Sequence, residues 1–175
     1  EMTKGQTALA GSCQYMVKRE QEIFLEKGEE IPETKIEGAN YIEFRALKDP
    51  REILMLDPAC GSMHFGLYCF DLFEQIYLEA WDNHPELLTD LRDKYMRDDF
   101  IKRIPGYILR FNIHGVDIDP RAIQIAGLSL WLRAQKSYDK LGLQPADRPA
   151  ISKSNLVIAE PMPGDAHLLS EFTKS

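Results

Sequence analysis

The sequence predicts an α/β protein in which a parallel sheet is flanked by helices. Three short apolar runs, at 53–56, 113–118 and 155–159, have the length and composition of strands. Two longer stretches between them, 65–81 and 120–141, repeat apolar residues at helical spacing. Strands and helices that alternate in this way are typical of right-handed βαβ units. We therefore expect the carboxyl ends of the three strands to meet at one ligand-binding edge of the sheet.

The bulk composition fits one ordinary globular domain. The chain has 175 residues, of which 44% are hydrophobic and 28% charged, and no apolar run approaches the ~20 residues that span a bilayer. The N-terminus lacks the basic and then apolar build of a signal peptide. Cys13, Cys60 and Cys69 are odd in number and form no CxxC pair, which argues against a disulfide framework or a zinc site. We expect a cytoplasmic protein with no metal site.

The charge balance argues against a chain that grips nucleic acid strongly by itself. The net charge is −7, and the basic clusters at 18–19 and 92–94 are interrupted or flanked by acids. Affinity for DNA comes largely from Lys and Arg side chains that displace counterions from phosphates. If the chain belongs to a DNA-modifying enzyme, we expect the main DNA contacts to lie in regions outside it.

The segment before the first predicted strand is expected to form a separate N-terminal unit over 1–47. Residues 7–27 have the pattern of an amphipathic helix, and 41–47 fit a helix or a strand equally well. The predicted sheet unit follows over 48–175. It carries a charged, mostly helical insertion at about 82–106 between the first helix and the second strand.

A tight turn follows the first predicted strand. The four consecutive apolar residues at 53–56 fit a strand buried on both faces. Asp57 and Pro58 then stop the strand, and the run 59–62 supplies small side chains before a helix opens. Such a turn lets a ligand approach the backbone closely, near the N-terminal amides of the helix. The alternative is an ordinary strand-to-helix turn with Asp57 in solvent.

This turn resembles motif I of S-adenosylmethionine-dependent DNA methyltransferases of the amino (adenine-N6) class. The family usually reads Asp-Pro-Ala-Cys-Gly-Ser-Gly, and residues 57–63 read Asp-Pro-Ala-Cys-Gly-Ser-Met. The resemblance implies the donor-binding half of a Rossmann-like class I methyltransferase fold, with S-adenosylmethionine as cofactor. It also implies that Asp57 contacts the ammonium group of the donor, while the backbone of 59–61 lines the donor's tail and ribose.

Met63 departs from the family pattern, which has glycine at this position. If the position needs a positive φ, methionine is strained there by ~1 kcal/mol or more. Alternatively, Met63 adopts helical geometry and narrows the donor pocket.

The end of the second predicted strand resembles motif II of the same family. Residues 114–122 read His-Gly-Val-Asp-Ile-Asp-Pro-Arg-Ala. The resemblance implies that Asp117 accepts hydrogen bonds from the ribose hydroxyls and that Ile118 packs against the adenine. Asp119 precedes Pro120, so we interpret it as the N-cap of the following helix.

The end of the third predicted strand resembles motif III. In the family, an acid at this place accepts a hydrogen bond from the adenine amino group. The resemblance favours Glu160 over Asp165 for this role. The alternative is that Glu160 is an acid in solvent on a proline-rich loop. The residues that the resemblance assigns to donor binding are Asp57, Pro58, Ala59, Cys60, Gly61, Phe65, Asp117, Ile118 and Glu160.

The overall match is similar to the large, PglX-like methyltransferases of phage-defence and restriction–modification systems. That family transfers a methyl group to adenine N6 on a base flipped out of DNA. Its base-holding Asn/Asp-Pro-Pro-Tyr motif does not occur in these 175 residues, so we expect donor binding without catalysis from this chain alone and assign no catalytic residue. Motifs I to III do not report the acceptor, which leaves an RNA or protein methyltransferase, or a non-catalytic nucleotide-binding domain, as alternatives.

Overall fold

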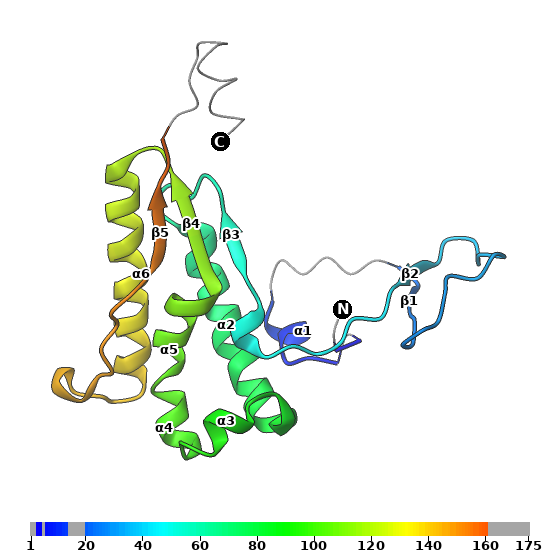
Figure 1. Cartoon of the computed structure of the whole chain (residues 1–175), viewed down its shortest axis with the longest axis horizontal. Helices are drawn as coiled ribbons and strands as arrows, with labels where there is room; N and C mark the ends of the chain where they lie inside the picture. The colour runs from blue at the N-terminus through cyan, green and yellow to red at the C-terminus, as the bar shows by residue number, and fades with distance from the viewer. Residues whose placement is uncertain (1–2, 5, 14–19, 161–175) are drawn as a thin grey trace, which may run out of the picture.

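The sheet at the centre of the molecule has three parallel strands in the order β3-β4-β5. The computed structural model describes residues 3–4, 6–13 and 20–160. The strands are β3 (Met55–Asp57), β4 (Ile113–Asp117) and β5 (Asn155–Ile158). The α/β class and the parallel arrangement predicted from the sequence are therefore confirmed. The three strands point the same way in Figure 1, so their carboxyl ends share one edge.

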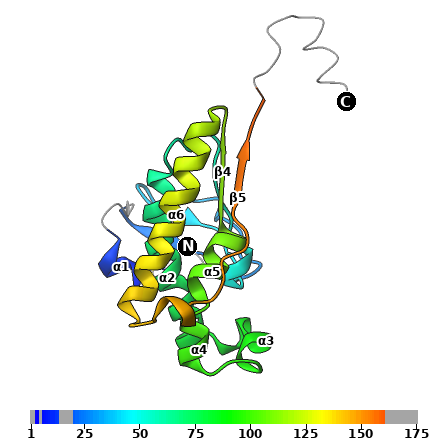
Figure 2. The same ribbon diagram turned by 90° about the vertical axis from the view of Figure 1, so that its left-hand side faces the viewer.

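Two long helices, α2 (His64–Asn83) and α6 (Pro120–Lys140), cover one face of this sheet (Figures 1 and 2). Both carry their apolar residues at intervals of three and four, which places one stripe of each helix against the strands. The buried side chains of these stripes are Phe70, Phe73, Tyr77, Ala80 and Trp81 from α2, and Ala126, Leu130, Ala134 and Tyr138 from α6. None of the helices in the described part of the chain is both long and apolar enough to cross a membrane.

Short helices connect α2 to β4 and close the lower end of the core. They are η2 (Pro85–Leu87), α3 (Thr89–Arg92), α4 (Arg97–Ile101), α5 (Ile104–Tyr107) and the π-helical turn η3 (Ile108–Asn112). Phe100 of α4 is fully buried and stacks on Trp81 of α2, with ring centroids 4.2 Å apart. This stacking attaches the connecting segment to the main core. A further short turn, η4 (Pro145–Asp147), leads from α6 toward β5.

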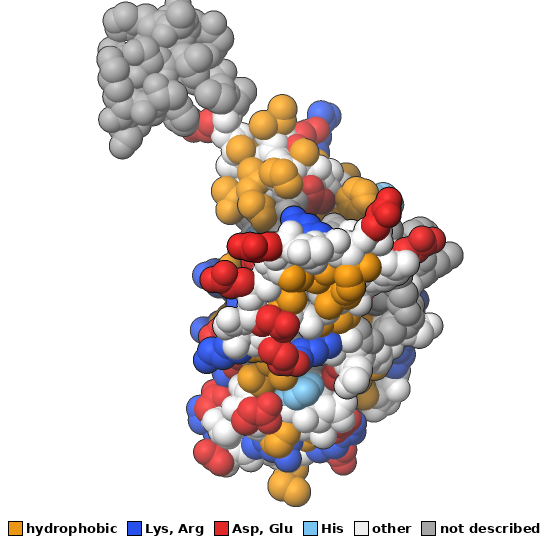
Figure 3. Space-filling model, turned by 90° about the vertical axis from the view of Figure 1, so that its right-hand side faces the viewer, with side chains coloured by type: hydrophobic (Ala, Val, Ile, Leu, Met, Phe, Trp, Pro, Cys, Tyr) orange, Lys and Arg blue, Asp and Glu red, His pale blue; other side chains and the backbone are white. Residues whose placement is uncertain are grey.

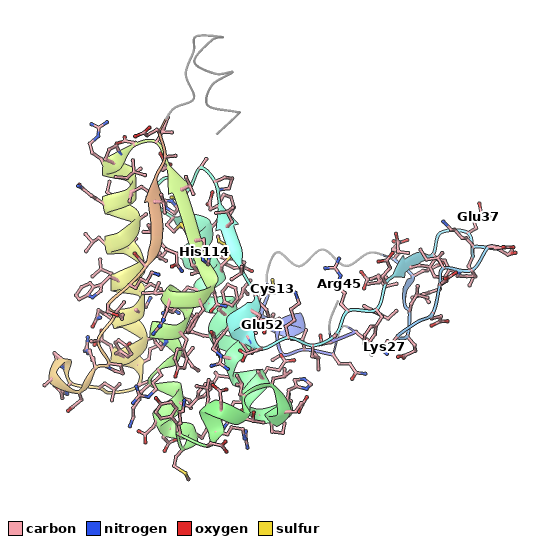
Figure 4. The ribbon with its side chains drawn as sticks, viewed as in Figure 1. Cys13, Lys27, Glu37, Arg45, Glu52 and His114 are labelled. Atoms are coloured by element: carbon pink, nitrogen blue, oxygen red, sulfur yellow. The ribbon has the colours of Figure 1, made fainter. Side chains whose placement is uncertain are left out.

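The N-terminal part begins with α1 (Leu9–Ser12), which lies beside α2: Thr7 and Cys13, on either side of α1, hydrogen-bond to Glu79 and Tyr68 of α2. An arm that extends away from the sheet carries two short parallel strands, β1 (Glu22–Phe24) and β2 (Asn40–Ile42) (Figure 1). Figure 4 shows Lys27 and Glu37 far from the strands of the main sheet. The arm rejoins the sheet through η1 (Pro50–Glu52), which directly precedes β3.

The single amphipathic helix predicted over 7–27 is wrong. The described helix ends at Ser12, and the same range contains β1. Ile23 pairs in parallel register with Tyr41, so a partner distant in sequence decides the conformation of this segment against its helical pattern. The ambiguity over 41–47 resolves in the same way, because Asn40–Ile42 is the strand and 43–49 has no regular structure.

One face of the main sheet is open, which contradicts the expectation that the first strand is buried on both faces. Leu54 is 67% exposed, Leu56 is 63% exposed and Val157 of β5 is 57% exposed. Figure 2 shows α2 and α6 on one side of β4 and β5, with no helix against the opposite face among the described residues. The apolar run does form a strand, as the sequence predicts, but the described residues cover only one of its two faces.

A buried asparagine links the start of the sheet to α2. Asn112 is fully buried and precedes β4. Its side-chain Nδ2 donates to the carbonyls of Pro50 (2.6 Å) and Ile53 (2.8 Å), and its Oδ1 accepts from the Tyr77 hydroxyl (2.9 Å). All three polar groups that meet the Asn112 side chain therefore have a partner, as buried polar groups require. This network positions the entry to β3 against the start of β4.

We expect Asn112→Ala to lower the free energy of unfolding by roughly 2–4 kcal/mol, because it removes three side-chain hydrogen bonds at a fully buried position and leaves the Tyr77 hydroxyl without its acceptor. Tyr77→Phe removes only one of the three hydrogen bonds and should cost roughly 1–2 kcal/mol. Urea unfolding followed by circular dichroism measures both values. Equal costs for the two variants would contradict the central place of Asn112 in the network.

Candidate functional site

The three segments predicted to bind the donor lie at the shared carboxyl edge of the sheet. In the strand register, Asp57 at the end of β3 lies beside Gly115, and Asp117 at the end of β4 lies beside Ile158. The backbone N–H of Ala159 donates to the carbonyl of Asp117 over 2.8 Å. The turn after β3, the end of β4 and the segment after β5 are thus neighbours at the top of Figure 1. The structure brings the segments together, while the assigned contacts with a donor stay predictions.

The carboxylate of Asp117 ties two of these segments to each other. Its Oδ2 accepts the backbone N–H of Gly61 (2.8 Å), and its Oδ1 accepts the N–H of Asp119 (2.9 Å). These two donors, that of Asp119 first, lower the pKa of Asp117 below its ordinary value. An ionised carboxylate has about four acceptor positions, so acceptor capacity remains for other donors. Asp117 can therefore hold the loops and still accept hydrogen bonds from a ligand.

The turn after β3 packs tightly on β4 through its small side chains. Its backbone N–H at Cys60 donates to the carbonyl of Val116 over 3.0 Å, and the Cys60 side chain is buried beneath the turn. A Cβ atom added at Gly115 would lie 3.1 Å from Cys60 Sγ and 2.8 Å from a methyl of Leu156, so any larger residue would displace both side chains. Sequence analysis missed Gly115 as a site residue, although a glycine inside a strand is itself a signal of close approach.

Above the turn the backbone is open. Gly61 has a φ of +51°, and a Cβ atom added there would meet nothing within 4 Å. Asp57 accepts the N–H of Ala59 (3.3 Å), which stabilises the turn locally. Pro58 and Ala59 are exposed at this surface. The free space over Gly61 lies next to the carboxylate of Asp117, to which the Gly61 N–H is bonded.

Cys60 is a buried packing residue and no nucleophile. Burial raises the pKa of its thiol first, and the nearby carboxylates of Asp117 and Asp57 raise it further. The thiol is therefore protonated at neutral pH, whereas nucleophilic cysteines need a lowered pKa. Cys13, Cys60 and Cys69 are all free cysteines.

Met63 adopts the strained alternative of the two that the sequence left open. Its φ is +69°, in the left-handed region, and it precedes the first residue of α2. Its side chain is fully buried and packs against Gly66, where an added Cβ atom would lie 2.6 Å from Met63 Cγ. The methionine thus belongs to the core and does not fill the space over Gly61. Burying a whole methionine contributes ~1.5–3 kcal/mol, which offsets the backbone strain.

Asp119 caps α6, as the sequence indicates. Its side chain accepts the N–H of Arg121 over 2.9 Å and also pairs with the guanidinium of that residue, and Pro120 occupies the first helical position. The capping role leaves Asp117 as the acid at the end of β4 that faces the turn.

Two large apolar side chains flank the acids at this edge. Phe65 is 76% exposed at the start of α2, and Ile118 is 66% exposed directly after β4. Glu160 is exposed two residues after β5. Figure 3 shows apolar side chains gathered near this end of the molecule, below the grey residues. The weaker candidate Asp165 lies outside the described residues.

The comparisons with known proteins agree with this reading. No protein-family model matches the chain. The chain is 32% identical over 120 residues to the adenine-specific methyltransferase BrxX of Escherichia coli O9:H4, a match that covers 69% of this chain and 8% of that protein. It is 35% identical over 107 residues to a putative type II restriction enzyme and methyltransferase of Methanocaldococcus jannaschii, covering 61% of this chain and 8% of the relative.

The chain is thus similar to an adenine-specific methyltransferase and to a putative type II restriction enzyme and methyltransferase. These similarities confirm the resemblance to adenine-specific and restriction-type methyltransferases that the three motifs predict. The chain spans about 8% of the length of these methyltransferases.

The contact between Met63 and Gly66 can be tested by a double-mutant cycle. Glycine to alanine inside a helix usually stabilises a protein by ~0.5–1 kcal/mol, but Gly66→Ala should destabilise it by ~1–2 kcal/mol because the new Cβ atom overlaps Met63. In a Met63→Gly background the same change should stabilise the protein. Urea unfolding of all four forms gives the coupling energy. A stabilising Gly66→Ala in both backgrounds would contradict the contact.

The hydrogen bonds of Asp117 predict a pH dependence of stability. Because the folded-state pKa lies below that of the unfolded chain, the charged carboxylate stabilises the fold above the unfolded-state pKa of about 3.9 and loses this effect as the pH falls toward the folded value. Asp117→Asn should therefore lower the melting temperature most near pH 7. The difference in melting temperature from the unchanged protein should shrink between about pH 5 and pH 3.

Asp147→Asn, on an exposed turn, controls for the loss of one negative charge. A difference between Asp117→Asn and the unchanged protein that stays constant from pH 7 to pH 3 would contradict this role of the Asp117 carboxylate.

Proposed function

We propose that the chain is the donor-binding portion of an enzyme that transfers a methyl group from S-adenosylmethionine to adenine N6 in DNA. The observation that carries this proposal is the position of Asp117, which joins the turn after β3 to the end of β4 and keeps acceptor capacity beside the exposed Ile118. The relatedness to an adenine-specific methyltransferase and to a restriction enzyme and methyltransferase supports the same reaction.

The residues at the edge fit the chemistry of this donor. S-adenosylmethionine carries positive charge on its sulfonium and ammonium groups, and the edge offers the carboxylates of Asp57, Asp117 and Glu160. Arg121, which follows β4 at this edge, pairs with Asp119. The open space over Gly61 admits a ligand against the backbone. The charge and the shape of the edge therefore both favour a cationic nucleoside.

The start of α2 suits the carboxylate of the donor. Met63 at the N-cap offers no side-chain acceptor to the helix, and the Ser62 hydroxyl bonds to Nδ1 of His64 at 2.8 Å instead of capping. The first-turn N–H groups of α2 are therefore not capped by a side chain. Such groups favour anions, so we assign them to the donor's carboxylate.

In this proposal the chain binds and orients the donor, and the donor supplies a methyl group on a positively charged sulfur, ready for direct transfer to an amine. The remaining acceptor positions of Asp117 accept the ribose hydroxyls. Ile118 packs against the adenine ring, Glu160 accepts the adenine amino group, and Phe65 shields the site from water.

The chain alone is proposed to hold the donor without acting on DNA. The Asn/Asp-Pro-Pro-Tyr motif that would hold the target base is absent from these 175 residues. The open face of the sheet, with Leu54, Leu56 and Val157 exposed, fits a Rossmann-like class I domain whose other helical layer comes from elsewhere in a longer polypeptide. The 8% coverage of both relatives is consistent with this division.

Calorimetric titration with S-adenosylmethionine or S-adenosylhomocysteine tests the proposal. We expect saturable binding, and we expect Asp117→Ala to weaken it roughly tenfold or more, because charge-assisted hydrogen bonds to the ribose are lost. Asp98→Ala, on the exposed start of α4, is the matched control and should leave the dissociation constant unchanged. No binding at millimolar donor by the folded protein would favour a non-catalytic domain instead. An unchanged constant in Asp117→Ala would overturn the ribose assignment.

A further inference from the structure

A cavity lies at the opposite end of the sheet from the donor edge. It has a volume of about 180 Å³ and opens between α5 with η3 on one side and the segment that leads into β5 on the other. Figure 1 shows α5 beyond the amino end of β4, away from the arrowheads. We call this cavity the amino-end pocket. Its lining includes Arg103, Tyr107, Arg110, Ser152 and Lys153.

The amino-end pocket is basic although the chain is acidic. Three cationic side chains, those of Arg103, Arg110 and Lys153, line it, and none of its lining residues is an acid. In the whole sequence, 28 acids face 21 lysines and arginines. Three cations gathered without a carboxylate therefore contrast with the rest of the molecule, and a positive cavity concentrates anions.

Two of these cations lack the acceptors that other arginines have. Within the described residues, neither Arg103 nor Arg110 forms an ion pair or donates a side-chain hydrogen bond, and each guanidinium lies over an aromatic ring instead, at 4.2 Å from Tyr95 and 5.1 Å from Phe111. By contrast, these arginines donate to carboxylates or to a backbone carbonyl: Arg51, Arg92, Arg97, Arg121, Arg133 and Arg148. Of these eight arginines, Arg103 and Arg110 are thus the two whose guanidinium groups stay available, and both line this pocket.

The Nε atom of Arg103 is buried and has no hydrogen-bond partner. Among the described residues it is the one buried side-chain nitrogen or oxygen of this kind. A buried donor without an acceptor costs about 1–3 kcal/mol, and more when it is charged. Buried polar groups are otherwise satisfied almost without exception, so such an atom indicates a missing partner. Stacking on Tyr95 fixes the plane of the guanidinium but offers no acceptor to its Nε–H.

Further donors line the same pocket. Ser152 contributes a hydroxyl, and the backbone N–H groups of 151–153 make no hydrogen bond to other described residues. A ligand here therefore meets several donors and no anionic acceptor. A phosphate group matches this set, because it has several charged oxygens and pairs with the fork of N–H groups on arginine.

We propose that the amino-end pocket binds a phosphate group, through Arg103, Arg110 and Lys153. The site is distinct from the donor edge and does not rest on the function proposed for that edge. The phosphate can come from free inorganic phosphate or from the phosphodiester backbone of DNA, and the two sources share the same recognition chemistry.

Nuclear magnetic resonance of the labelled chain tests the proposal directly. Titration with inorganic phosphate, against sodium chloride at matched ionic strength, should shift the Arg103 Nε–H resonance and the amides of 151–153 in a saturable way. Arg110→Ala/Lys153→Ala should weaken this binding at least tenfold. Arg97→Ala/Lys136→Ala removes the same charge elsewhere and should leave it unchanged.

A second measurement separates the two sources. Fluorescence anisotropy with a short duplex DNA, repeated at several salt concentrations, gives the salt dependence of binding for each variant. If the backbone is the source, Arg110→Ala/Lys153→Ala weakens DNA binding and reduces the salt slope by about two. If the source is free phosphate, this variant loses phosphate binding and leaves DNA binding as in the control pair.

The proposal is overturned if the folded protein shows no saturable shift with phosphate and no difference in DNA binding between the two double variants. Titration of the same samples with S-adenosylhomocysteine reports on the donor edge independently. A failure of the amino-end pocket is thereby distinguished from a failure of the proposed donor site.

Discussion

The backbone N–H groups of Gly61 and Asp119 converge on one carboxylate, that of Asp117, at 2.8 and 2.9 Å. The bond from Gly61 crosses from the turn after β3 to the end of β4, two segments that are far apart in the sequence, and the bond from Asp119 fixes the carboxylate locally. Without them, the turn would be held to the sheet mainly by the bond from Cys60 to Val116. The same hydrogen bonds lower the pKa of Asp117 and so favour its charged form. The geometry of the candidate donor site therefore depends on the same group that is proposed to bind the ribose.

Small residues make this arrangement sterically possible. Gly115 lets the Cys60 side chain lie against the central strand, and Gly66 makes room for the buried side chain of Met63. Met63 keeps a left-handed backbone that glycine would adopt without strain, and the core packing of its side chain compensates. The departure from the family motif is thus accommodated inside the protein, on the side of the turn away from the open space over Gly61.

The two ends of the sheet have opposite electrostatic character. The carboxyl edge carries Asp57, Asp117 and Glu160, which suits a cationic donor, and the amino-end pocket gathers Arg103, Arg110 and Lys153, which suits an anion. Between them the sheet leaves one face uncovered, with apolar side chains exposed. The chain therefore combines a core covered by α2 and α6 with an apolar sheet face that no described residue covers.

The sequence by itself determined the parallel α/β class, the two long helices, the cap at Asp119 and the three motif segments, because these depend on local periodicity, turn chemistry and short-range hydrogen bonds. The tertiary structure alone decided the rest. The strand pairing of Ile23 with Tyr41 replaced the helix predicted over 7–27, and the absence of a covering layer among the described residues exposed Leu54 and Leu56. Likewise, the buried network of Asn112 and the meeting of Arg103 with Arg110 and Lys153 join residues distant in sequence. Local pattern cannot report such contacts, since each depends on which segments pack together in space.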